Sequence, residues 1–368
     1  MFSYDKLKIV ELEITNKCQA ACPMCPRNIH GGIENKELKL NDWSFNDFKD
    51  IFTKDVVNKI ENFTFCGNFG DPLLNTELLE ILEYIKENNP STYVHIHTNG
   101  SLRNITWWKN LILYLPYNHD VTFALDGLAD TNHLYRVDTD FNKIIENAKA
   151  FIASGGNANW QFILFKHNQH QIEQAELLSK KIGFKKFVLK NTRRFTTNKF
   201  PVLDRKGNIS HYLEPNTINP IPIVTKDNLL STKLFWSTMQ ELDCFPINTK
   251  SIFIDANFTV FPCCILASWV YTSFDDNIFK KYKIYNENTS VNIIGQEIKD
   301  EVFELIESLG GFDLINCKKM SLKSIISSET WQKLWHNKWN STGIKSCSLM
   351  CNKKSPFISL EEQKVKNV

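Results

Sequence analysis

The sequence has almost no net charge and no long apolar run. Lysine and arginine total 43 against 41 aspartates and glutamates, a formal charge of +2. So small a charge gives no electrostatic basis for binding nucleic acid or an anionic membrane surface. The chain also has no run of about 18 apolar residues and no secretory signal, so we expect a cytoplasmic protein without a membrane partner.

Hydrophobic residues make up 42% of the chain and charged residues 23%, which is ordinary for a folded globular protein. A length of 368 residues predicts two or three domains of about 150 residues each. In a cytoplasmic protein the ten cysteines are expected to be metal ligands or buried thiols rather than disulfides.

Three of the cysteines lie close together near the start of the chain. Cys18, Cys22 and Cys25 have the spacing Cys-x3-Cys-x2-Cys directly after a short apolar strand. An odd number of cysteines suits neither disulfides nor a closed zinc site, which needs four ligands. A four-iron four-sulfur cluster held by three thiolates fits better. Its fourth iron would lack a protein ligand, as in a metal centre that does chemistry.

Strand and helix patterns alternate along the first half of the chain. Residues 8–14 have the period of a strand and 41–58 that of a helix. Further strands are expected near 62–66, 92–97, 120–125, 159–165 and 185–190, and further helices near 75–88, 104–115, 140–154 and 169–182. Such βα units predict an α/β fold, an open, partial (β/α)6 TIM-like barrel, with ligands at the C-terminal strand ends.

The cysteine spacing, its place after the first strand, and Met24 before the third cysteine resemble the radical S-adenosylmethionine (radical SAM) enzymes. The resemblance implies that Cys18, Cys22 and Cys25 hold a catalytic 4Fe-4S cluster. In that family the open iron binds the amino and carboxylate groups of SAM. An electron from the cluster then releases a 5'-deoxyadenosyl radical, which abstracts hydrogen from a substrate.

Two later segments resemble SAM-binding segments of that family. Gly70, Asp71 and Pro72 are similar to its Gly-Gly-Glu-Pro segment, with Asp71 in place of Glu, and imply a contact with the SAM amino group. Thr98 and Asn99 are similar to the Thr-Asn-Gly end of its third strand, beside the adenosine. By residue type alone, Gly-Asp-Pro and Asn-Gly are ordinary turns.

Polar residues after the next strands complete the resemblance. Asp126 and Arg136 match a Ser-x-Asp-Gly segment with a downstream Arg, although Ala124 replaces the Ser. The resemblance implies that Asp126 contacts SAM and that Arg136 pairs with its carboxylate. For Arg136 the alternative is a surface ion pair. Asn168 resembles a polar residue near the methionine portion of SAM. His95 and His97 share a strand face, and we interpret them as partly buried histidines rather than ligands.

The second half of the chain carries the remaining group of cysteines. Residues 193–235, rich in proline, are interpreted as a connector. A hairpin over 251–263 and a Cys-x3-Cys pair then give a four-thiolate set, Cys244, Cys263, Cys347 and Cys351. Adjacent strand residues face opposite ways, so Cys264 is an alternative to Cys263. Cys317 is another alternative or an inert thiol, and four thiolates suit zinc equally well.

This second set resembles the SPASM and twitch extensions of radical SAM enzymes. The Cys-x2-Cys-x5-Cys run of a full SPASM domain is missing, so the resemblance implies one auxiliary 4Fe-4S cluster in a small α+β, twitch-like domain. We therefore expect a radical SAM barrel over 1–192, the connector, an auxiliary-cluster domain over 236–355 and a frayed tail over 356–368.

The resemblance predicts a radical SAM oxidoreductase that oxidises or cross-links a peptide or protein side chain, with the auxiliary cluster as electron acceptor. The alternative within enzymes is a dehydrogenase of a small sugar- or nucleotide-derived molecule. The alternative of another class is a noncatalytic iron-sulfur electron carrier or metal-binding protein. A flavodoxin or ferredoxin is the reductant that the resemblance implies.

Overall fold

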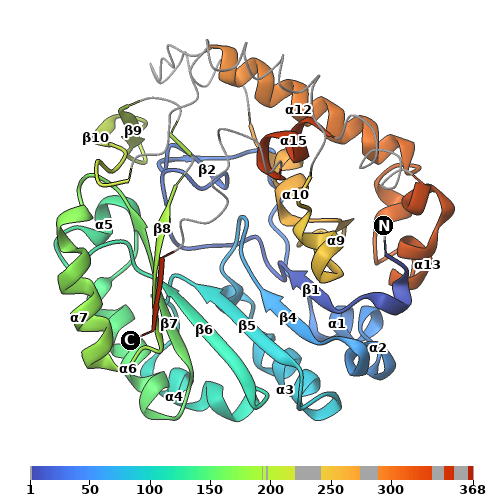
Figure 1. The fold of residues 1–368 in the computed structure, drawn as a ribbon, viewed down its shortest axis with the longest axis horizontal. Coiled ribbons are helices and arrows are strands. Elements are labelled where there is room, and N and C mark those ends of the chain that lie inside the picture. The colour runs from blue at the N-terminus through green and yellow to red at the C-terminus, as the bar shows by residue number, and fades with distance from the viewer. Residues whose placement is uncertain are drawn as a thin grey trace.

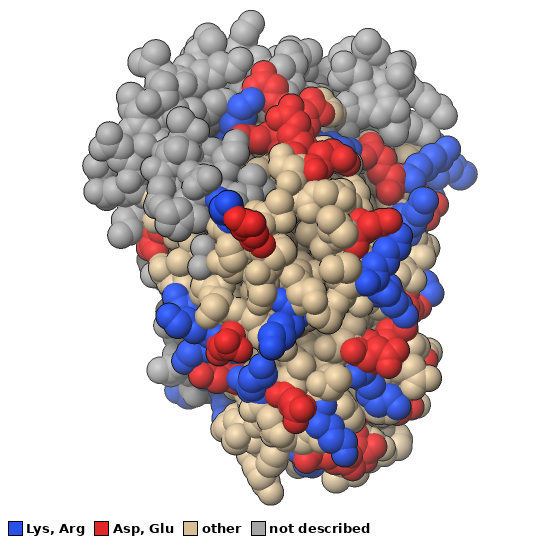
Figure 2. Space-filling model, turned by 90° about the vertical axis from the view of Figure 1, so that its right-hand side faces the viewer, with Lys and Arg blue, Asp and Glu red and all other residues tan. Residues whose placement is uncertain are grey.

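The computed structural model describes residues 2–192, 194–195, 198–219, 242–273, 289–333, 344–351 and 364–367. Within them, the main sheet has nine strands in the order β12-β11-β1-β4-β5-β6-β7-β8-β13. Helices lie along the outer side of this curved sheet (Figure 1). None of the helices in these ranges is both long and apolar enough to cross a membrane. Acidic and basic side chains are interspersed on the face drawn in Figure 2, as the near-zero net charge predicts.

The six central strands are parallel and confirm the predicted partial (β/α)6 barrel. They are β1 (Ile9–Leu12), β4 (Asn62–Phe65), β5 (Tyr93–Thr98), β6 (Asn118–Ala124), β7 (Ala158–Leu164) and β8 (Lys186–Asn191). The connecting helices are α1 (Phe45–Ile51), α2 (Lys54–Lys59), α3 (Leu78–Asn88), α4 (Ile105–Tyr114), α5 (Asn132–Tyr135), α6 (Phe141–Ala153) and α7 (Ile172–Ile182).

The expected single helix over 41–58 is two helices. α1 ends at Phe52, whose backbone N–H donates to Phe48 O, and Thr53 is the N-cap of α2. The Phe52 ring is fully buried and lies edge-on to Phe63 of β4, 5.5 Å between ring centres. The Phe52 ring packs against the sheet, and the chain therefore leaves the helix at this residue.

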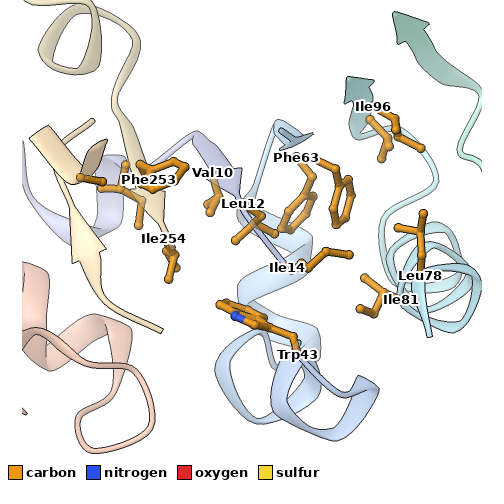
Figure 3. Packing of buried hydrophobic residues seen from close by; sticks show 14 of the residues in the cluster. Val10, Leu12, Ile14, Trp43, Phe63, Leu78, Ile81, Ile96, Phe253 and Ile254 are labelled. Atoms are coloured by element: carbon orange, nitrogen blue, oxygen red, sulfur yellow. The ribbon is translucent and has the colours of Figure 1, made fainter. Parts of the chain in front are cut away.

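One face of each strand packs against the helices. Figure 3 shows this core around Val10, Leu12 and Phe63, with Trp43 and Leu78 from the helical side. Complete burial of such a side chain stabilises the fold by about 1.5–3 kcal/mol. Because strand side chains alternate between faces, the residues between these positions point to the barrel interior, and many of them are polar.

The hairpin predicted over 251–263 is present but belongs to the barrel sheet. β11 (Ser251–Ile254) is antiparallel to β12 (Val260–Phe261) and parallel to β1. The helices of this half of the chain are α9 (Phe245–Thr249), α10 (Cys264–Tyr271), α12 (Thr289–Ser308), α13 (Leu322–Ser327) and α15 (Lys345–Cys351). The division of the chain into a barrel and an auxiliary domain stays a prediction.

Two segments expected to lack regular structure contain strands. β9 (Phe200–Leu203) and β10 (Ile209–Leu213) form an antiparallel hairpin within the expected connector. β13 (Lys364–Asn367) pairs antiparallel with β8, so the end of the expected tail adds a strand to the sheet edge. The rest of the connector from 220 and of the tail to 363 lies outside the described residues. A shorter hairpin joins β2 (Asn28–Ile29) to β3 (Ile33–Glu34).

Candidate active site

A cavity of about 510 Å³ opens where the parallel strands end. Its lining includes the three N-terminal cysteines, the turn after β4 and the ends of β5, β6 and β8. The residues that the sequence assigned to it and that line it are Cys18, Cys22, Cys25, Gly70, Asp71, Thr98, Asn99 and Arg136. Ligand sites of open parallel sheets lie at this end of the strands.

The three cysteines belong to one loop that follows β1. The thiols of Cys22 and Cys25 lie close enough to Cys18 to interact with it electrostatically. The Cys25 backbone N–H donates to Cys22 O at 3.0 Å and closes a turn. Burial raises the pKa of the Cys18 thiol, and it also raises that of Cys22 against the opposing charge of Arg136. Thiols buried in this way need a cation to hold them as thiolates, which a metal centre would supply.

This donor set fits a cluster with three protein ligands. Cys66 also lines the cavity, but its Sγ donates to Leu12 O at 3.7 Å and its charge neighbours are Glu11 and Glu13. Cys18, Cys22 and Cys25 are thus the lining thiols that interact electrostatically with one another. No group of three His, Cys, Asp or Glu side chains in the described part of the chain is arranged around a single metal ion.

Asp71 is the centre of a hydrogen-bond network at the end of β5. Its carboxylate accepts from Thr98 Oγ1 at 3.0 Å, from Asn99 N at 2.8 Å and from Asn99 Nδ2 at 2.6 Å. Gln19 Nε2 in turn donates to Asn99 Oδ1 at 2.8 Å, one residue after Cys18. Asp71 therefore fixes the Thr98-Asn99 turn against the cysteine loop.

Gly70 is required by close backbone contact. A Cβ there would lie 1.9 Å from Thr15 O, in the segment that leads into the cysteine loop. Only glycine permits so close an approach, which here is made to the chain itself. Pro72 begins a short 3₁₀ turn (Pro72–Leu74) and is buried behind Gly70 and Asp71.

Glu13 is a site residue that the sequence analysis missed. Its Oε1 accepts from the backbone N–H groups of Phe69 at 2.6 Å and of Gly70 at 3.0 Å. The side chain is 1% exposed, and burial raises its pKa to about 8. The strand alternation places Glu13 on the same face as Glu11, and a carboxylate directly before a cysteine loop was the available signal.

Asp126 and Arg136 form a buried ion pair. Arg136 Nε lies 2.6 Å from Asp126 Oδ2, and Asp126 Oδ1 accepts from Ile163 N at 2.5 Å. Burial raises the pKa of Asp126 although Arg136 opposes this. Arg136 Nη1 also points to Cys22 Sγ at 3.8 Å. The pair thus links the loop after β6 to the cysteine loop.

Asn168 supports the same loop from behind. Its Nδ2 donates to Asp126 O at 2.8 Å, and its Oδ1 accepts from Phe165 N at 2.8 Å. It is fully buried, and neither Asn168 nor Asp126 lines the cavity. The structure therefore gives both side chains internal partners, and Arg136 is the member of this group that reaches the cavity.

The four C-terminal cysteines of the predicted set are brought together. Cys347 lies close enough to Cys263, Cys351 and Cys244 for the four thiols to interact electrostatically. Cys263 precedes α10, whereas Cys347 and Cys351 lie on α15. Of the two alternative ligands, Cys264 lies close to Glu11 and Cys66 as well as to Cys263, and Cys317 lies close to Asp255.

Two solved structures with bound S-adenosylmethionine illustrate what the chain is similar to. One is "Native anSMEcpe with bound AdoMet and Kp18Cys peptide", at 14% identity and a TM-score of 0.50, over 89% of this chain and 82% of that one. Another is Streptococcus suis SuiB bound to S-adenosylmethionine, at 13% identity and a TM-score of 0.46, over 77% of this chain and 70% of that one. At 14% identity the likeness to anSMEcpe shows the fold alone, and the SuiB match, with a TM-score of 0.46, carries no argument.

Sequence comparisons give one curated relative and one family match. A 7,8-dihydro-6-hydroxymethylpterin dimethyltransferase of Methanocaldococcus jannaschii is 25% identical over 154 residues. The match covers 38% of this chain and 27% of that protein, so the chain spans about a quarter of the relative's length. Residues 12–178 match the model of the Radical SAM superfamily. This part of the chain is therefore similar to the radical SAM domain.

Proposed function

We propose that the protein is a radical SAM oxidoreductase that cleaves SAM reductively and abstracts hydrogen from a bound substrate. One observation carries the proposal: the three thiols of the cysteine loop and the Gly70-Asp71 turn line one cavity at the ends of parallel strands. Cys18, Cys22 and Cys25 would hold a 4Fe-4S cluster. When bound, that cluster would supply the electron that splits SAM into methionine and a 5'-deoxyadenosyl radical.

The chain's own residues position SAM and the cysteine loop. We assign SAM to the lining formed by Gly70, Asp71, Thr98 and Asn99, with Pro72 shaping the turn behind it. Asp71 holds the Thr98-Asn99 turn, and the Asp126-Arg136 pair, held from behind by Asn168, orients Arg136 toward the cavity. A reactive radical needs such a fixed geometry, because misplacement by about 1 Å costs about 100-fold in rate.

A second, smaller core shields the cysteine loop. Cys22 and Met24 pack against Phe165 and against Val202 and Leu213 of the β9–β10 hairpin. These apolar side chains exclude water from the back of the loop. Exclusion of water protects a reactive intermediate from side reactions.

We further propose that Cys244, Cys263, Cys347 and Cys351 hold one auxiliary 4Fe-4S cluster that accepts an electron from the substrate. Four thiolates would leave no iron open for substrate, which favours electron transfer over substrate binding. A peptide or protein side chain is the proposed substrate, since the similar anSMEcpe structure contains a peptide. A flavodoxin or ferredoxin would supply the first electron.

The primary test is SAM cleavage by anaerobically reconstituted protein with dithionite. We expect 5'-deoxyadenosine from the wild-type protein and none from Cys22→Ala, with Cys317→Ala as the control at a half-buried thiol elsewhere in the fold. A wild-type protein with full iron content that makes no 5'-deoxyadenosine would overturn the proposed reaction.

The auxiliary site is tested by iron and sulfide analysis. Cys351→Ala should lose about four iron and four sulfide ions per chain while SAM cleavage is largely kept. Cys264→Ala, at the neighbour of Cys263, should keep them all. Full iron in Cys351→Ala, or equal loss in both variants, would contradict the assignment.

A further inference from the structure

One wall of the cavity carries polar side chains that the fold does not use. His97 of β5, Gln161 of β7 and Lys190 of β8 all line the cavity. In the part of the chain that the structure describes, no hydrogen bond or ion pair joins any of these three side chains to another residue. The His97 ring lies against the His95 ring, with 4.1 Å between ring centres and a tilt of 46° between the ring planes.

The other charged side chains of the lining already have partners. The carboxylate of Asp71 is occupied by Thr98 and Asn99. Arg136 is paired with Asp126, and Arg194 Nη1 donates to Met24 O at 3.0 Å. The ammonium group of Lys190 therefore stands on the wall without an anion of its own.

An unpaired cation in a half-enclosed cavity is costly unless something compensates its charge. Lys190 lies close enough to Asp126 to feel its charge, but that carboxylate is bonded to Arg136. Burial accordingly lowers the pKa of Lys190. A buried lysine stays protonated only when an anion lies nearby. The missing counter-charge therefore points to an anionic ligand.

We propose that Lys190, with His97 and Gln161, binds an anionic oxygen group, a carboxylate or a phosphate, of a molecule held in the cavity. Three strands of the barrel sheet, β5, β7 and β8, then contribute a charge and two polar groups to one oxyanion. Ala124 of β6 lines the same cavity, and its small side chain leaves room in front of them. The inference rests on the proposed function only in taking the cavity as the SAM and substrate site.

Two molecules could bring that group. One is SAM, through its amino-acid carboxylate, to which Arg136 offers only its Nη atoms because its Nε is bound to Asp126. The other is the second substrate, which would then be an acidic side chain, a carboxylic acid or a phosphorylated compound. The two sources can be told apart by removing Lys190 and measuring which kind of ligand, SAM-like or phosphate-like, then binds more weakly.

The experiment compares reconstituted wild-type protein with Lys190→Met and Lys186→Met. Lys186 is the matched control, because it lies on the same strand, is exposed and does not line the cavity. Equilibrium dialysis gives Kd for S-adenosylhomocysteine, for 5'-methylthioadenosine, which lacks the carboxylate, and for inorganic phosphate added to protein saturated with S-adenosylhomocysteine.

We expect Lys190→Met to weaken one carboxylate or phosphate probe by about 10-fold or more, the usual effect of losing a charged hydrogen bond. Loss for S-adenosylhomocysteine but not for 5'-methylthioadenosine assigns the anion to SAM. Loss for phosphate alone assigns it to the second substrate. Lys190→Arg should keep most of the affinity, and Lys186→Met should match the wild-type protein.

The proposal is wrong if all three dissociation constants of Lys190→Met stay within about twofold of wild type. It is equally wrong if 5'-methylthioadenosine loses as much affinity as S-adenosylhomocysteine, or if Lys186→Met behaves like Lys190→Met. None of these measurements uses turnover. A wild-type protein that binds the probes but makes no 5'-deoxyadenosine would count against the proposed function alone.

Discussion

The buried carboxyl of Glu13 ties the stability of the barrel to pH. Burial raises its pKa from 4.5 to about 8. Between these values the folded chain keeps a proton that the unfolded chain has released. The free energy of unfolding therefore falls as the pH rises through this window, and Glu13 has no effect below it. The whole shift corresponds to about 5 kcal/mol.

Glu13→Gln removes the titration and keeps the shape. The amide oxygen still accepts from Phe69 N and Gly70 N, which the native Oε1 contacts at 2.6 and 3.0 Å. We expect the wild-type protein to lose several kcal/mol relative to the variant between about pH 5 and about pH 9. Urea unfolding of both proteins, reconstituted in parallel, measures the difference at each pH.

A difference that stays constant with pH would refute this reasoning. It would mean that the carboxyl is ionised at neutral pH and that the two backbone N–H groups compensate its burial. The charge of Asp255, which also raises the pKa of Glu13, would then be too weakly felt to matter.

Two further substitutions test the contacts around the cavity. Asp126→Ala leaves Arg136 buried without its partner and should lower the free energy of unfolding by about 3–5 kcal/mol in a urea titration. Glu61→Ala, at an exposed ion pair, should lower it by about 1 kcal/mol or less. Equal effects of the two variants would contradict the role of burial. Gly70→Ala would place a Cβ 1.9 Å from Thr15 O, so a loss of about 1–3 kcal/mol and weaker S-adenosylhomocysteine binding are expected, and wild-type values for both would refute the close contact.

Local sequence patterns predicted the barrel well. The alternation in 8–14 and the helical spacing in 140–154 are local signals, and β1 and α6 form there. The break at Phe52 was missed, because it depends on a ring contact with Phe63 that no local pattern contains. Glu13 was missed for a similar reason, since its partners at Phe69 and Gly70 lie more than fifty residues away.

The candidate site divides in the same way. The spacing of the cysteine loop was sufficient to place three thiols on one cavity, because one short loop carries them all. The partners of Asp126 and Asn168 were not predictable, since they depend on how the loop after β6 folds back on Arg136 and on β7. Residue type indicates that such a side chain is polar, but only the fold shows whether it faces a ligand or the chain.

The sheet connects the two proposed metal sites. β1 leads directly into the cysteine loop, and β11, paired with β1 from Ile9↔Ser251 to Leu12↔Ile254, leads through β12 to Cys263. A parallel pair held at four positions cannot slip without reversing which side chains face the core. Cys264 and Cys66 also share charge contacts beside this pair. The pairing of β1 with β11 therefore holds the start of the cysteine loop and the hairpin that leads to Cys263 in one register, because a one-residue slip would turn the core-facing side chains away from the core.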